Sequence, residues 1–146
     1  MASKKSAAQL KPVKSKEMTQ EEKFNHDVPV LSYKIKSQVI ASKRIDCMVQ
    51  LREEYISFFR GTPSLDELKA IQEAMTKVYE EIDKIIDGLT IEKLLEEEDL
   101  IAHMFKDPKD IKDETEMFYE FATFMYARPW AEMLLELKQE IKMLGD

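Results

Sequence analysis

Apolar residues in the middle of the chain recur at alternating steps of three and four positions, which is typical of a helix that buries one face. The positions are Leu68, Ile71, Met75, Val78, Ile82, Ile85 and Leu89. Ser64 and Glu67 match a capping box at the start of this run, although Thr62 followed by proline offers an alternative start. We therefore expect a helix over residues 64–88 that ends at Gly88 and carries a heptad seam.

A second apolar stripe precedes this helix and predicts another long helix over about residues 32–60. Its members are Ile35, Val39, Ile45, Met48, Val49, Ile56 and Phe59. Pro29 disfavours an earlier start, Ser32 suits an N-cap, and Gly61 suits a left-handed C-cap. Because only a short Gly/Pro turn separates the two helices, we expect them to pack as an antiparallel hairpin.

The rest of the chain predicts two or three further helices. Thr90 is expected to cap a helix that ends near Lys106, because an Asp-Pro pair follows. Another helix starts around Asp110 and carries a wide apolar face, and Pro129 then kinks or breaks the chain. The final seam comprises Trp130, Leu134, Leu137 and Ile141. The expected fold is therefore all-α, a hairpin extended into a small bundle of four or five helices.

Residues 1–28 lack apolar periodicity and predict a flexible basic arm in front of a single helical domain at residues 29–146. The first sixteen positions contain no acidic residue. They contain the lysines Lys4, Lys5, Lys11, Lys14 and Lys16. Phe24 is the exception in this arm, a large apolar side chain suited to docking on the domain.

Charge is divided unevenly along the chain. Residues 1–60 carry 12 Lys and Arg against 7 Asp and Glu, a net of +5, whereas residues 61–146 carry 10 against 22, a net of −12. The positive charge continues from the arm into the first predicted helix. The residues concerned are Lys34, Lys36, Lys43 and Arg44. With the lysines of the arm, they are candidates for contacts with phosphates or with an acidic protein surface.

The corresponding candidate acidic docking patch is a run of four adjacent acids. It comprises Glu96, Glu97, Glu98 and Asp99. Such a run is usually a solvated helix face. Here, however, the chain itself contains a basic segment, so the arm of a neighbouring copy is a candidate partner for these acids.

The apolar seams are candidates for helix packing, either inside one chain or between two copies. Two ladders and an aromatic stripe form a large apolar face for so short a chain, which favours self-association. Tyr126 and Trp130 belong to the residue types that anchor interfaces, although both equally suit a core.

No motif for catalysis, metal binding or cofactor binding stands out. The Glu-x-x-His pattern of di-iron bundles fails, because the residue three positions before His103 is Leu100. We interpret Asp99 and His103 as a surface pair, or the histidine as partly buried, and not as metal ligands. Cys47 is interpreted as an inert thiol, since no histidine motif accompanies it. We therefore expect neither enzymatic activity nor a bound cofactor.

Three features predict an intracellular protein that is neither secreted nor embedded in a membrane. The single cysteine permits no intramolecular disulfide. No apolar run approaches the roughly 18 residues of a membrane span. Lysines recur through the N-terminal residues, which is unlike a signal peptide.

The leading hypothesis is a non-enzymatic helical assembly or adaptor protein. It would act through protein–protein contacts, self-associate, and dock its basic arm on an acidic surface. The alternative is a nucleic-acid-binding accessory protein that uses the arm and the Lys34–Arg44 stretch for sequence-independent phosphate contacts.

Overall fold

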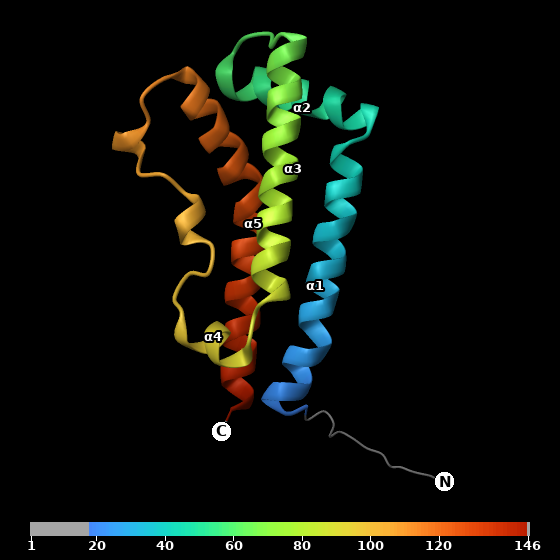
Figure 1. The fold of residues 1–146 in the computed structure, drawn as a ribbon, viewed down its shortest axis with the longest axis vertical. Coiled ribbons are helices and arrows are strands. Elements are labelled where there is room, and N and C mark those ends of the chain that lie inside the picture. Colours follow the sequence, from blue (N-terminus) through green and yellow to red (C-terminus); the bar gives the residue numbers. More distant parts are fainter. Residues whose placement is uncertain (1–17, 146) are drawn as a thin grey trace.

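Three long helices form the bundle in the computed structural model of the chain, which describes residues 18–145. The helices are α1 (Gln20–Ser42), α2 (Ile45–Phe59), α3 (Leu65–Asp87), α4 (Ile91–Glu96) and α5 (Glu114–Leu144), with 3-10 turns η1 (Ala102–Met104) and η2 (Pro108–Asp110). α1 runs antiparallel to α3 and α5, and α2 crosses the end at which α3 and α5 begin (Figure 1). The predicted all-α bundle is confirmed, and no strand occurs within the described residues.

α1 begins much earlier than the sequence pattern predicted. Thr19 and Glu22 form a capping box in which the Thr19 Oγ1 accepts from the Glu22 backbone N–H at 3.1 Å. Residues 20–28, which were expected in the flexible arm, are therefore helical, and Phe24 packs against the core. Residues 1–17, with the five lysines of the arm, lie outside the described residues.

The expected helix start at Ser32 is wrong, and Pro29 lies inside α1. A mid-helix proline removes one backbone hydrogen bond. Here Pro29 and Asn25, whose carbonyl would have accepted that bond, are both exposed, so water can replace the lost donor. Val28 and Leu31 bury their side chains in the core on the opposite side. Ser32 instead donates its hydroxyl to Asp83 Oδ1 on α3 at 2.8 Å.

The long helix expected over residues 32–60 is two helices, because the chain turns at Lys43 and Arg44. The end of α1 is held by side chains of α3. The Gln72 Nε2 donates to the Ser42 carbonyl at 2.6 Å, and the buried Ser42 hydroxyl lies 2.9 Å from Thr76 Oγ1. The hairpin partner of α3 is therefore α1, with α2 as a crossing connection.

α2 is attached to the start of α5 by an aromatic cluster. Phe59 packs against Phe118 and Phe121 with ring centroids 6.2 and 5.3 Å apart, and Phe58 lies 4.6 Å from Phe121. The left-handed residue at the end of α2 is Arg60, with φ 55°, and not the expected Gly61.

α3 agrees with the pattern that predicted it. Ser64 and Glu67 form the expected capping box, and the helix ends at Asp87, just before Gly88. The seam is buried from Leu68 to Ile82, and its last member, Leu89, is buried as well, just after the helix. Beyond Ile82, Ile86 takes the buried position and Ile85 is only partly buried, because a straight helix has 3.6 residues per turn and drifts away from a heptad.

The helix expected from Thr90 to Lys106 ends already at Glu96. Thr90 caps it as predicted, and Asp107 caps η2. Between them the chain is largely non-helical, and it bows away from α3 and α5 before α5 starts (Figure 1). On a continued helix Glu96 and Asp99 would lie three residues apart on one face, and the repulsion between their like charges disfavours continuation. Ile101, which is 0% exposed, anchors the connection on the bundle.

α5 is one helix and not two, because it continues through Pro129 to Leu144 without a break. Asp113 caps its start by accepting from the Glu116 backbone N–H at 2.9 Å. Pro129 is exposed, whereas the final seam faces the core. The inward faces of α1, α3 and α5 thus close on one another within a single chain.

Candidate functional site

The residues predicted as interface seams are mostly buried inside one copy. Ile85 and Tyr126 are half-buried, and the others are buried. The buried members are Leu68, Ile71, Met75, Val78, Ile82, Trp130, Leu134, Leu137 and Ile141. The structure therefore shows these residues packed within one chain. An interface between two copies would use other, exposed residues.

The basic residues of α1 do not form one continuous patch. Lys34 lines a groove against Glu136 and Glu140 of α5. Lys36 lies about 200° further around the helix, on the same flank as Lys43, which follows seven residues later. The structure therefore groups Lys36 and Lys43 near the end of α1 and leaves Lys34 apart.

Exposed apolar side chains surround the turn between α1 and α2. Ile40 is 70% exposed, Ile45 is 86% exposed and Val49 is 59% exposed. They lie within a few residues of Lys43 and Arg44, which are exposed as well. We call Ile40, Lys43, Arg44, Ile45 and Val49 the basic corner.

The sequence pattern assigned two members of this corner, Ile45 and Val49, to a buried stripe, and that assignment is wrong. A signal was present in the spacing. Ile45 follows the buried Ile35 by ten residues, which would rotate it about 80° away from that face on a continuous helix.

The acidic patch, Glu96 to Asp99, lies at the opposite end of the bundle, beside α4 (Figure 1). All four side chains are exposed, and only Glu96 is helical. The Lys138 ammonium donates to the Glu97 carbonyl at 2.6 Å, and the Ile101 backbone N–H donates to Asp99 Oδ1 at 3.1 Å. The acidic patch therefore lies mostly on the non-helical chain that follows α4, and not on one turn of a helix.

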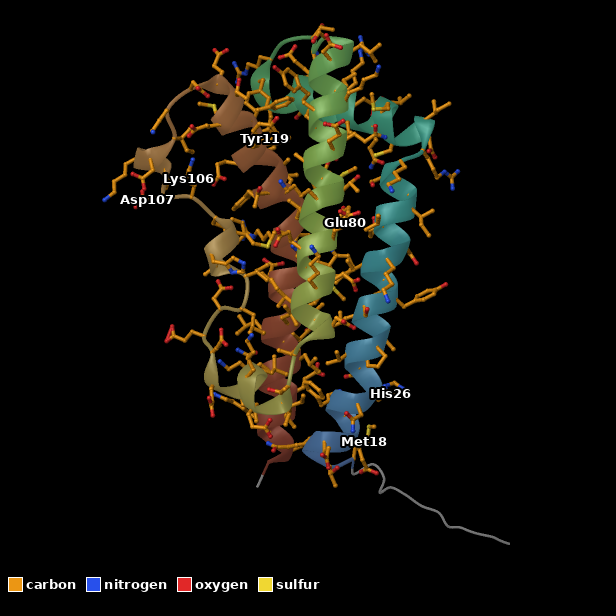
Figure 2. All side chains as sticks on the ribbon, viewed as in Figure 1. Met18, His26, Glu80, Lys106, Asp107 and Tyr119 are labelled. Atoms are coloured by element: carbon orange, nitrogen blue, oxygen red, sulfur yellow. The ribbon has the colours of Figure 1, made fainter. Side chains whose placement is uncertain are left out.

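An apolar notch of about 60 Å³ adjoins the acidic patch. Its apolar walls are Leu94, Leu100, Ile101, Ala131, Leu134 and Leu135. Leu135 on α5 is half exposed there. The connection to α5 alternates in charge, and its outward bow carries Lys106 and Asp107 (Figure 2).

A second feature, which sequence reasoning missed, is a pocket of about 240 Å³ where four helices meet behind the basic corner. Its walls come from α1, α2, α3 and α5. The lining residues are Gln38, Ala41, Ser42, Arg44, Asp46, Cys47, Gln50, Leu51, Glu54, Met75, Tyr79 and Tyr126. Residues from such distant parts of the chain have no common sequence signal, so only the tertiary fold reveals the pocket.

Two tyrosines and one carboxylate form the polar interior of this pocket. The Tyr126 hydroxyl donates to Glu54 Oε2 at 2.7 Å, and burial together with that carboxylate raises the pKa of Tyr126 far above its usual range. Tyr79 packs edge-on against Tyr126 and Trp130, with centroids 6.0 and 6.5 Å apart. Burial raises the pKa of Tyr79 as well, and the Cys47 thiol, which is ionised only at high pH, and the Glu54 carboxylate raise it further. Both hydroxyls are therefore protonated at neutral pH.

Cys47 lines the same pocket. Burial raises the pKa of its thiol, and the nearby carboxylates of Glu54 and Asp46 raise it further. The thiol is thus neutral at physiological pH, and a neutral thiol is a poor nucleophile. No histidine lines this pocket.

None of the helices between residues 18 and 145 combines the length and the apolar character needed to cross a membrane. In the same part of the chain, His, Cys, Asp and Glu side chains do not gather in groups of three or more that could hold a metal ion. Comparisons with protein-family models, with curated proteins and with solved structures found no match.

Proposed function

We propose that this protein is a non-enzymatic helical adaptor that assembles with itself, by docking its basic corner on the acidic patch of a second copy. The observation that carries the proposal is the exposure of Ile40, Ile45 and Val49 beside Lys43 and Arg44. Exposed apolar groups that form a cluster, rimmed by charge, are typical of protein–protein contact sites.

The opposite net charges of the two surfaces support a second copy of the chain as the partner of the basic corner. Residues 28–60 carry six Lys and Arg against three Asp and Glu, a net of +3. Residues 92–116 carry four against ten, a net of −6. Attraction between surfaces of opposite sign steers association and fixes its register.

Apolar complementarity supports it as well. Ile45 projects from the basic corner, and the apolar notch adjoins the acidic patch. Burying one such side chain on association is worth about 1.5–3 kcal/mol. The charges would then set orientation, while the apolar contact supplies affinity.

The two surfaces cannot meet within one copy. α1 has 23 residues and is about 34 Å long, and the basic corner and α4 lie at its opposite ends (Figure 1). The contact would therefore join unlike surfaces of two copies. Such heterologous contacts produce either closed rings or open chains.

A charge swap tests the proposal. We expect Lys43→Glu/Arg44→Glu to abolish self-association, because the corner then repels the acidic patch, and Glu97→Lys/Glu98→Lys to do the same. Mixing the two variants should restore assemblies, since the corner of each variant then meets a patch of opposite charge on the other. Light scattering coupled to size-exclusion chromatography at low salt measures the mass of each sample.

The matched control is Glu80→Lys/Glu81→Lys, which makes the same change at two exposed residues on α3, where Glu80 is labelled in Figure 2. Because this control keeps both the basic corner and the acidic patch, it should self-associate like the unmodified chain. Loss of association in this control would mean that net charge alone drives association, and a mixture of the two charge-swapped variants that stays monomeric would refute the proposed contact.

Nucleic-acid binding through the basic residues is the second candidate, and the same samples separate it from the first. Co-eluting nucleic acid would raise the ratio of absorbance at 260 nm to that at 280 nm. Binding to phosphates would be lost in Lys43→Glu/Arg44→Glu but kept in Glu97→Lys/Glu98→Lys, which retains the basic corner, whereas self-association should be lost in both variants.

A further inference from the structure

The pocket behind the basic corner contains a buried polar group without a partner. The Tyr79 side chain is only 6% exposed and lines the pocket. Its hydroxyl makes no hydrogen bond with any residue between 18 and 145. Buried hydroxyls are nearly always hydrogen-bonded, because leaving one unsatisfied is costly. The hydroxyl therefore indicates that something else fills the pocket.

The charge of the pocket indicates what kind of ligand would fill it. Glu54 accepts from Tyr126 through Oε2 but forms no ion pair within the described residues. At the mouth, Arg44 and Asp46 face each other, with Nε and Oδ1 3.4 Å apart, and largely compensate one another. The pocket thus contains one half-buried carboxylate without an ion-pair partner among the described residues, and a cation would balance its charge.

The walls of the pocket favour an organic cation over a bare ion. The rings of Tyr79 and Tyr126 offer aromatic surfaces, and Leu51 and Met75 add apolar surface. Aromatic faces attract ammonium groups through cation–π interactions. The volume of about 240 Å³ is just below the range of roughly 300–1,000 Å³ for typical ligand pockets, so the occupant must be small.

We propose that this pocket binds a small organic ammonium compound, which places its cationic nitrogen against Glu54 and accepts a hydrogen bond from Tyr79. This ligand site goes beyond the proposed assembly function, and of its lining only Arg44, at the mouth, also belongs to the basic corner. Glu54 binds the charge, the Tyr79 hydroxyl binds an oxygen acceptor of the ligand, and the tyrosine rings and Met75 surround its apolar part.

Tyramine and tyrosol are a matched pair of probes for this site. They share one skeleton with an aromatic ring and a phenol oxygen, but tyramine carries an ammonium group where tyrosol carries a neutral hydroxyl. Isothermal titration of the full chain should show saturable binding of tyramine. Tyrosol should bind at least about tenfold more weakly, because a hydrogen bond to a charged group is lost.

Variants then locate the binding. Glu54→Gln should weaken tyramine binding at least about tenfold, and Tyr79→Phe should weaken it about two- to tenfold. Glu53→Gln is the matched control, since it removes the same charge from an exposed neighbour and should leave the affinity unchanged. Circular dichroism of each variant verifies that it is folded.

Three results would overturn the ligand proposal: no saturable binding of tyramine, equal binding of tyrosol and tyramine, or equal effects of Glu54→Gln and Glu53→Gln. Absence of binding would mean that water satisfies the Tyr79 hydroxyl, and either of the other two results would mean that Glu54 does not select a cation. None of them would bear on assembly, because Glu54 and Tyr79 belong neither to the basic corner nor to the acidic patch.

Discussion

Replacing Ile86 by alanine is expected to lower the free energy of unfolding by about 2–5 kcal/mol. The side chain is 2% exposed and belongs to the core formed by α1, α3 and α5. Truncating it removes buried apolar contacts and leaves a cavity that the rigid helices cannot close. The same replacement at Ile85, which is only partly buried on the same helix, should cost about 1 kcal/mol or less.

Urea denaturation followed by circular dichroism measures both variants, with Ile82→Ala as the reference. Ile82 is buried whichever period α3 follows, so its variant should be destabilised like that of Ile86. A larger loss for Ile85→Ala than for Ile86→Ala would mean that the heptad continues to the end of α3 and that the helix is rotated relative to this structure.

Replacing Ile101 by alanine is expected to release the connection between α4 and α5 while the three long helices stay folded. Ile101 is the completely buried residue of that connection, whose chain is otherwise largely non-helical. The change should cost about 2–5 kcal/mol of local stability. Because few other contacts hold this segment, the loss would appear as local opening and not as global unfolding.

Hydrogen exchange followed by mass spectrometry measures that opening. Peptides over residues 97–113 should exchange faster in Ile101→Ala, whereas peptides from the middle of α3 and α5 should not change. Leu100→Ala, at the partly buried neighbouring position, is the control and should have a smaller effect. Equal acceleration throughout α3 and α5 would contradict a local role for Ile101.

The parts of the fold that followed from the sequence are those in which local signals and burial agree. Around α3, a capping box, a regular apolar spacing and a terminal glycine all predicted the same helix, and the structure contains it. α5 carries a regular seam as well. Only the effect of Pro129 was open, and its exposed position allows the helix to continue.

The errors lie where tertiary contacts outweigh local preferences. Thr19 and Glu22 form the same kind of capping box as Ser64 and Glu67, but Pro29 suggested a later start for α1. The break after Ser42 depends on Gln72 and Thr76 of α3, which local sequence patterns do not reveal.

Of the candidate sites, the charged surfaces could be predicted from the sequence, whereas the pocket could not. Charge counting identified Lys43, Arg44 and the acidic patch, because runs of charge are visible in the sequence. The pocket was missed, since its key members are 25 and 72 positions from Glu54 along the chain, at Tyr79 and Tyr126. Their relation arises only when α2 crosses the end of the bundle.

The contact between the basic corner and the acidic patch is tested most directly by hydrogen exchange of the unmodified chain at low and at high protein concentration. Association should slow exchange in two separate segments at once, residues 40–50 and residues 92–101, and high salt should remove both effects. Equal exchange at the two concentrations, or slower exchange confined to other segments, would contradict the proposed assembly.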